Sequence, residues 1–330
     1  MPKISDVASR AGVSPATASR VLNGKSTVAP ELAERVQAAA AEMQYRPNGL
    51  ARSLRRRETT VIALIIGDVE NPFFTSLARG VEDAAHADGY SVILCNSDED
   101  PVKERRYVDV ALQERAAGVV LSSAGSTESI GMLRDQRIPF VAVDRPVEGA
   151  ATDTVVVDTR SAAAAATLHL LEQGYQRIGC IAGPAGIATA DDRLAGYRDA
   201  LRAANRRIPA RLVRHAEFKA AGAKAAARQL LDRRERPDAL LVANCVMARG
   251  VLEAMAELGL RSGRDVGLAA FDDDPWTTLI TPPMTVIAQP AHDLGLIATR
   301  LLLSRIADPA RAATTSTLHA TLIPRGSTER

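Results

Sequence analysis

Hydrophobic positions near the N-terminus recur at helical spacing in three short groups. Two groups lie within residues 4–23 and are separated by a break, and residues 30–43 carry a third apolar stripe. At the break, Gly12 suits the end of a helix, Ser14 can cap the next one, and Pro15 fits its first turn. The pattern predicts a small all-α domain in which a helix-turn-helix is closed by a third helix.

From residue 61 onward, short continuous apolar runs alternate with amphipathic stretches. Such runs are typical of strands buried on both faces of a parallel sheet, and the alternation with helices predicts a doubly wound α/β fold. The predicted strands are residues 61–67, 90–96, 117–123, 139–144, 154–158, 177–183, 211–216, 239–245, 266–273 and 285–290. Predicted helices include residues 74–88, 161–173, 194–204 and 220–233.

This second region repeats itself approximately. The helix with Gly80 and the strand after it are echoed by the helix with Gly196 and the strand at 211–216, and two further strand pairs follow in the same order. One large sheet is the alternative, but a repeat favours two Rossmann-like lobes with parallel sheets. Facing lobes form a cleft at their strand ends, which is the usual ligand position in such folds.

The predicted outer face of the second helix carries small and polar side chains. Ala16, Ser19, Arg20 and Asn23 lie on it, a set that suits entry into a DNA major groove, where Arg20 can bind a guanine edge. An ordinary helical hairpin with a solvated face is the alternative. Residues 45–57, YRPNGLARSLRRR, add a basic stretch that is too short to form a stable helix alone and is expected to order on a partner.

Charge is distributed unevenly along the chain. Of 330 residues 46% are hydrophobic and 24% charged, as in a soluble globular protein, and the net charge is +2. Residues 1–60 hold ten Lys or Arg against five Asp or Glu, so positive charge concentrates at the N-terminus. This bias favours phosphate binding there, although it could also serve solubility.

Cysteine usage and the lack of long apolar segments predict a cytoplasmic location. Cys95, Cys180 and Cys245 lie in or beside apolar runs without a CxxC pair, so we expect reduced thiols rather than a disulfide framework. No stretch resembles a secretory signal or reaches the length of a membrane span.

The segments AGVSPATASRVLN and YRPNGLARSLRRR resemble the DNA-binding head and hinge of the Lac repressor/Gal repressor family of bacterial transcription regulators. The resemblance implies a homodimer on a near-palindromic operator in the nucleoid, with Leu54 wedged into a minor-groove base step. It assigns DNA contacts to Ser5, Ser14, Pro15, Ala16, Thr17, Ser19, Arg20, Asn23, Asn48, Leu50, Ala51, Arg52, Leu54 and Arg55.

The resemblance also implies a division of the chain, with a body similar to the type I periplasmic sugar-binding proteins. The expected parts are a head at 1–46, a hinge helix and linker at 47–60, and an effector-binding and dimerisation domain at 61–330. Within that domain, lobe one is expected at about 61–158 and 289–318, and lobe two at about 159–288 and 319–330.

Charged, amide and aromatic side chains gather at the predicted strand ends. Such groups are suited to a small polyhydroxylated molecule, and in a chain with 3% aromatic residues their placement is informative. The resemblance assigns an effector, a sugar or sugar derivative, to Asn71, Phe73, Phe74, Asp144, Arg145, Arg193, Phe218, Asn244, Asp272 and Gln289. The chain departs from the family pattern at Ala18, where Val is usual, and at Cys245, where an acidic residue is common.

The sequence supports three alternative functions less well. An enzyme would need a motif such as GxGxxG, GxxxxGK[ST], GxSxG or HExxH, and none is present, so we expect no catalysis, cofactor or metal. A periplasmic sugar receptor would lack the DNA-binding head. A catabolite-control regulator that answers to a phosphorylated carrier protein fits the same residues and is the closer alternative.

Overall fold

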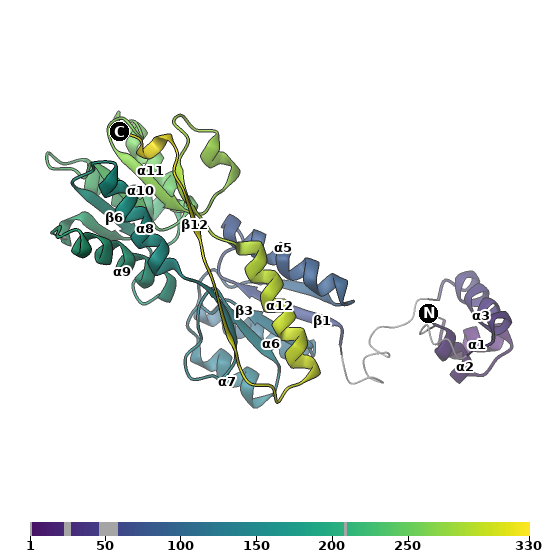
Figure 1. Cartoon of the computed structure of the whole chain (residues 1–330). Helices are drawn as coiled ribbons and strands as arrows, with labels where there is room; N and C mark the ends of the chain where they lie inside the picture. Colours follow the sequence, from purple (N-terminus) through teal and green to yellow (C-terminus); the bar gives the residue numbers. More distant parts are fainter. Residues whose placement is uncertain (1, 23–27, 46–58, 208–209) are drawn as a thin grey trace. The chain divides into compact units, whose positions relative to one another are not determined.

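The computed structural model describes residues 2–22, 28–45, 59–207 and 210–330. The chain divides into two compact units, Met1–Thr59 and Thr60–Arg330, which we call the head and the body. Figure 1 shows the helices and strands of both units.

The head contains the three predicted helices, α1 (Ile4–Ala11), α2 (Pro15–Leu22) and α3 (Pro30–Glu42). Gly12 ends α1 in the left-handed conformation at φ 64°, which favours glycine. The hydroxyl of Ser14 accepts a hydrogen bond from the Thr17 backbone N–H at 3.1 Å and so caps α2. Val7, Ala18 and Val36 are buried together, so each helix contributes to one small core.

The body alternates strands and helices, as predicted. Its strands are β1 (Val61–Ile66), β2 (Ser91–Asn96), β3 (Gly118–Leu121), β4 (Phe140–Val143), β5 (Asp153–Val157), β6 (Ile178–Ala182), β7 (Val213–His215), β8 (Ala239–Val242), β9 (Gly267–Phe271), β10 (Thr285–Ala288), β11 (Thr315–Leu318) and β12 (Thr321–Ile323). Its helices are α5 (Pro72–Ala87), α6 (Pro101–Gln113), α7 (Thr127–Asp135), α8 (Thr159–Glu172), α9 (Ala188–Ala203), α10 (Ala220–Leu231), α11 (Cys245–Glu257) and α12 (Ala291–Ala307).

The strands form two six-stranded sheets with equivalent orders, β11-β5-β4-β3-β1-β2 and β12-β10-β9-β8-β6-β7. We call the first sheet with its helices lobe one and the second lobe two. This equivalence confirms the internal repeat. The chain crosses between lobes after β5, after β10 and between β11 and β12, which Figure 1 shows as adjacent connections. Contrary to expectation, lobe two is not wholly parallel, because β12 pairs antiparallel with β10.

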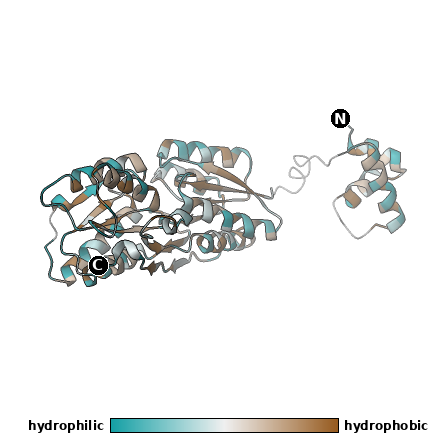
Figure 2. Cartoon of the chain, turned by 90° about the horizontal axis from the view of Figure 1, so that it is seen from above, coloured by the Kyte–Doolittle hydropathy of each residue, from teal (hydrophilic) through white to brown (hydrophobic). Residues whose placement is uncertain are grey.

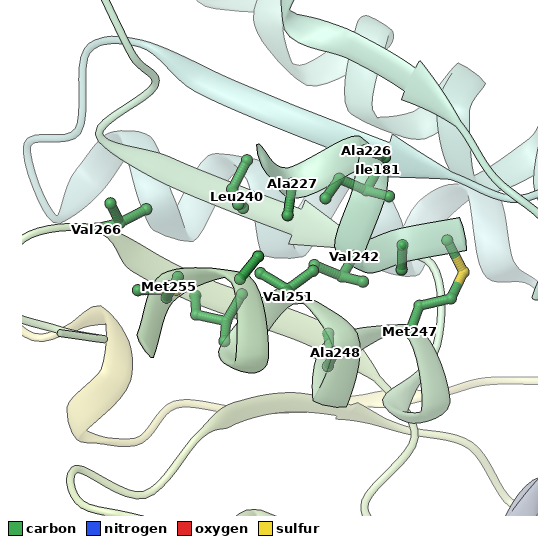
Figure 3. Close-up of a cluster of buried hydrophobic side chains, with 14 of the residues drawn as sticks. Ile181, Ala226, Ala227, Leu240, Val242, Met247, Ala248, Val251, Met255 and Val266 are labelled. Carbon is green, nitrogen blue, oxygen red and sulfur yellow. The ribbon is translucent and has the colours of Figure 1, made fainter. Parts of the chain in front are cut away.

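Each sheet lies between two layers of helices. In Figure 2 the strands are mostly brown, and the helices that cover them show both teal and brown residues, as expected for amphipathic helices. Figure 3 shows one such layer, where Met247 and Val251 of α11 and Ala227 of α10 pack against Leu240 and Val242 of β8. The resulting cores hold the strand ends, and the loops that follow them, in fixed positions.

Candidate functional site

The structure brings together side chains from the carboxyl ends of strands in both lobes. One cleft is lined by Asp68, Asn71, Phe73, Phe74, Glu99, Asp144, Arg145, Thr189, Arg193, Phe218, Asn244, Asp272 and Gln289. All ten body residues expected to contact an effector are in this set. Asp68, Glu99 and Thr189 join them without having been expected.

Asparagines position the start of two helices at the cleft. The Asn71 side chain accepts a hydrogen bond from the Phe73 backbone N–H at 3.1 Å, and Asn244 accepts one from Met247 at 2.7 Å. Asn244 therefore caps α11 itself, and the Cys245 departure removes no cap. In the part of the chain that the structure describes, the buried Nδ2 of Asn244 has no hydrogen-bond partner.

The two adjacent phenylalanines serve both the core and the cleft. Phe73 and Phe74 are 6% and 3% exposed and pack edge to face with ring centroids 5.2 Å apart. Both belong to the core of lobe one while lining the cleft. Their rings can offer only an edge or part of a face to a ligand.

In lobe one, an acidic and a basic side chain follow β4 directly. Asp144 adopts φ 69°, and its carboxylate lies 3.3 Å from Nε of Arg145. The guanidinium of Arg145 donates two hydrogen bonds to Glu99, at 2.5 and 2.8 Å, and one to the Ser123 carbonyl at 3.2 Å. Arg145 is therefore engaged by the protein itself in this structure.

In lobe two, a buried arginine lies between a carboxylate, an amide and an aromatic ring. Arg193 donates to the Ala243 carbonyl at 2.6 Å and to Gln289 at 3.4 Å, and its guanidinium lies 4.2 Å from the centroid of Phe271. Gln289 in turn donates to Asp272 at 2.6 Å. Asp272 adopts φ 76° immediately after β9, which turns the chain away from the sheet at the cleft.

Burial changes the protonation equilibria of these groups. Desolvation raises the pKa of Asp144 and of Asp272, although the nearby arginines oppose the change. Desolvation also lowers the pKa of Arg193 despite the attraction of Asp272. A ligand that donates hydrogen bonds would stabilise both carboxylates in their charged form.

Contacts across the cleft join the lobes on one side. Nζ of Lys219, at the start of α10 in lobe two, lies 2.8 Å from Asp68 and 3.8 Å from Glu70 in lobe one. The guanidinium of Arg145 lies 6.0 Å from the ring centroid of Phe218. These contacts hold the lobes close together.

The space inside the cleft is small in this structure. Its volume is about 20 Å³, enough for one water molecule, whereas a neighbouring cavity that shares Arg145 measures about 310 Å³. The neighbouring cavity lies between the loop before α7 and the loop before α9. A sugar would therefore enter the inner cleft only when the lobes separate or its side chains rearrange.

The structure describes seven of the residues that are expected to contact DNA. They lie at the surface of the head, on α1, on α2 and in the turn before α2. Ser5, Ser14, Pro15, Ala16 and Arg20 are exposed, and Thr17 and Ser19 are half-buried. The other expected contacts lie outside the described residues, namely Asn23, Asn48, Leu50, Ala51, Arg52, Leu54 and Arg55.

Comparison with known proteins identifies the family. The family described as bacterial regulatory proteins, lacI family, matches residues 3–48, and a periplasmic binding protein-like domain matches residues 167–328. A ribose operon repressor from Halalkalibacterium halodurans is 39% identical over 306 residues, covering 93% of this chain and 91% of the relative. The chain belongs to the lacI family. It is thus a sequence-specific DNA-binding transcriptional regulator, and its relatives include ribose operon repressors.

Solved structures of lacI-family proteins agree with this assignment over almost the whole chain. A complex of the transcriptional regulator CelR with cellobiose has a TM-score of 0.76 and 31% identity, covering 99% of this chain and 100% of that chain. The Lac repressor dimer bound to operator and the anti-inducer ONPF has a TM-score of 0.87 and 27% identity, covering 99% of both chains. Within the described residues, no helix is long and apolar enough to cross a membrane.

Sequence reasoning missed Asp68, Glu99 and Thr189 in the cleft, and Lys219, which pairs with Asp68. Glu99 lies in an acidic run that resembles an exposed turn, Thr189 lies in an Ala-rich stretch, and Asp68 and Lys219 lie beside strand or helix ends. Asp68 directly follows the Gly67 that ends the predicted strand 61–67, the same kind of position that singled out Asp144 and Asp272. That signal could have identified Asp68, but not Glu99 or Lys219.

Proposed function

We propose that a small neutral sugar, bound in the cleft, controls how tightly this regulator binds its operator. The observation that carries the proposal is a set of buried N–H donors beside the buried carboxylates of Asp144 and Asp272. Within the described residues, Nε of Arg145, Nε of Arg193 and Nδ2 of Asn244 have no hydrogen-bond partner, although Nε of Arg145 lies 3.3 Å from the Asp144 carboxylate. A sugar hydroxyl both donates and accepts hydrogen bonds, so neighbouring hydroxyls can satisfy both kinds of group.

The charges of the cleft favour a neutral ligand. Asp68 is paired with Lys219 and Glu99 with Arg145, which leaves Arg193 facing two carboxylates. An anionic ligand would meet no surplus positive charge, whereas a neutral polyol can donate hydrogen bonds to the carboxylates. The related ribose operon repressor and the complex of CelR with cellobiose support a sugar. A phosphorylated carrier protein has less support, because it would not use a buried cleft.

Ligand binding is proposed to act through the angle between the lobes. A sugar that contacts Arg145 from one lobe and Arg193 from the other favours one angle between the lobes. If that angle also affects DNA binding, the sugar changes the affinity for the operator, and the size of this change is the coupling free energy. The predicted hinge at residues 47–60 would transmit the change, with Leu54 in the minor groove and Arg20 on a guanine edge of the major groove. Both induction and corepression fit this scheme.

The regulator is proposed to act in the cytoplasm as a homodimer. The similar Lac repressor structure is a dimer on its operator, which supports two heads on a near-palindromic site. We also propose a DNA-binding domain at 1–46, a hinge helix and linker at 47–60, and an effector-binding and dimerisation domain at 61–330. The lacI-family match to residues 3–48 and the division of the chain at Thr59 support these parts.

The test is operator binding with and without sugars. Operator fragments are selected from genomic DNA with the full chain, and their dissociation constants are measured against a panel of pentoses, hexoses and disaccharides. Asp272→Ala and Arg193→Ala should retain operator binding while sugar affinity falls by about 10- to 150-fold, because each loses a charge-assisted hydrogen bond. Arg264→Ala, which removes an exposed ion pair of the same lobe, is the matched control.

The proposal fails if no sugar in the panel changes operator binding. It also fails if both cleft variants keep the sugar dissociation constant within about threefold of the parent value, a change below about 0.7 kcal/mol. An unchanged response in Arg264→Ala shows that the loss is specific to the cleft.

A further inference from the structure

We infer that Glu99 excludes anionic ligands from the cleft by occupying the guanidinium of Arg145. The inference rests on the proposed function for the identity of the site. Beyond that function, the inference is that a single carboxylate of the protein, that of Glu99, makes the cleft select neutral sugars over anionic ones.

The geometry of the pair is that of an arginine binding an anionic ligand. Nη1 and Nη2 of Arg145 donate to Oε2 and Oε1 of Glu99 at 2.5 and 2.8 Å, so the contact is bidentate. Arginine binds the carboxylate or phosphate of a ligand through the same two parallel hydrogen bonds. Glu99 therefore occupies the edge of Arg145 that an anionic sugar would need.

The backbone near Glu99 is shaped for this contact. Glu99 adopts φ 59°, a left-handed conformation that is unfavourable for residues other than glycine, and its N–H donates to the Gly67 carbonyl at 3.0 Å. A side chain at Gly67 would collide with the carboxylate of Glu99. Glycine at 67 thus leaves the space in which the Glu99 side chain reaches Arg145.

Burial makes the contact strong and selective. The side chain of Arg145 is 6% exposed and that of Glu99 is 22% exposed, so water screens their attraction only weakly. Burial alone would lower the pKa of Arg145, but the hydrogen bonds and charge of Glu99 raise it, so this arginine remains charged. A ligand carboxylate would have to displace Glu99 and then lie close to it, and like charges repel.

Removing the charge of Glu99 should leave the guanidinium of Arg145 free to bind a ligand anion, while other hydrogen-bond acceptors remain in the cleft. Arg145 would keep the Ser123 carbonyl and the Asp144 carboxylate near Nε, while Nη2 would lose its carboxylate partner. The positive charges of Arg145 and Arg193 would then be equal in number to the negative charges of Asp144 and Asp272. An anionic sugar could bind to the vacated edge of Arg145.

The test compares neutral and anionic sugars of matched structure. Binding of D-ribose, D-ribose 5-phosphate, D-glucose and D-glucuronate to the full chain is measured by calorimetry for the parent, Glu99→Gln and Glu99→Ala. We expect D-ribose 5-phosphate or D-glucuronate to bind both variants at least about tenfold more tightly than the parent, because one charge-assisted pair becomes available to the ligand. Thermal unfolding of each variant establishes that it is folded.

Two controls assign the effect to the contact with Arg145. Asp98→Asn removes the same charge from the adjacent residue, which binds Lys103 and does not line the cleft, and it should leave anion binding unchanged. Adding Arg145→Met to Glu99→Gln should abolish the gain. The inference is overturned if neither folded Glu99 variant gains anion binding, if Asp98→Asn gains as much, or if the gain survives Arg145→Met. These outcomes do not depend on whether a neutral sugar binds, so they are separate from the test of the proposed function.

Discussion

Two buried carboxylates in lobe one have opposite effects on stability. Asp144, at the cleft, lies 3.3 Å from Nε of Arg145, and desolvation raises its pKa despite this neighbouring charge. Asp153, at the start of β5, binds Arg305 at 2.7 Å, Arg311 at 2.6 Å and Thr314 at 2.8 Å. Burial opposes ionisation there too, but these partners hold the pKa of Asp153 below its ordinary value. The Asp144 carboxylate therefore lowers the stability of the body and lies at the cleft, whereas the ion-paired Asp153 carboxylate stabilises the body.

We therefore predict opposite outcomes for two similar substitutions. Asp144→Asn should stabilise the body at neutral pH, because it removes a carboxyl group whose pKa is raised by burial, and Asn tolerates positive φ. Asp153→Asn should destabilise it by about 3 kcal/mol, because it leaves two arginines without their countercharge. Denaturant unfolding of the full chain at pH 7 measures both.

The two variants should also differ from the parent in how their stability depends on pH. The raised pKa of Asp144 makes its ionised form a cost that disappears as the pH falls below the ordinary carboxyl range. The lowered pKa of Asp153 gives a stabilisation that is present above that range and is lost as the pH falls through the lowered pKa. Both differences from the parent should therefore shrink in acid. Equal and pH-independent effects of the two variants would contradict this account.

Some single residues of the cleft could be predicted from the sequence, and others could not. Asp144, Arg145 and Asp272 were predictable because the family resemblance assigns them to the effector and each lies at the end of an apolar run, at the edge of the sheet where ligands bind. Glu99 was not, because its role depends on a contact with a residue 46 positions away and on the empty space at Gly67. Long-range side-chain pairing leaves no trace in local hydrophobic patterns.

At the scale of elements, pairs of helices in both lobes approach closely at glycines. A Cβ atom at Gly80 in α5 would collide with the His292 carbonyl of α12, and one at Gly196 in α9 would collide with the Arg160 carbonyl of α8. The sequence repeat identified these two glycines as equivalent, and the structure supplies the reason. Strands β11 and β12 were not predicted, because these edge strands are short and partly exposed and lack the long apolar run that marks the others.

We predict that Gly196→Ala destabilises the body by about 1–3 kcal/mol, because α8 and α9 must separate to admit the methyl group. Gly131→Ala is the matched control. Gly131 lies in α7 with open space around a Cβ atom, so alanine there should stabilise by about 0.5–1 kcal/mol through helix propensity alone. Thermal unfolding of the two variants measures both effects, and a neutral Gly196→Ala would refute the close packing.

At the scale of the whole molecule, several large apolar side chains lie exposed at the surface of the body. Ile93 and Leu94 are 41% and 46% exposed on β2, which is an edge strand of lobe one, and Leu279 is 81% exposed in lobe two. Proteins normally protect apolar edge strands, because such strands promote association. We therefore expect these residues to lie in the proposed dimer interface.

Leu94→Lys and Leu279→Lys should each weaken dimerisation by at least about tenfold, because burying an unpaired ammonium costs more than the lost apolar contact. Analytical ultracentrifugation of the full chain without DNA measures the dimer dissociation constant. Leu168→Lys is the control, since Leu168 is 47% exposed on α8 and lies on neither the β2 edge nor the segment with Leu279. Because two heads must bind one near-palindromic operator, the interface variants should also lose operator affinity while their sugar affinity stays at the parent value. A parent protein that is monomeric at micromolar concentration, or interface variants that dimerise as well as Leu168→Lys, would show that the exposed leucines lie outside the interface.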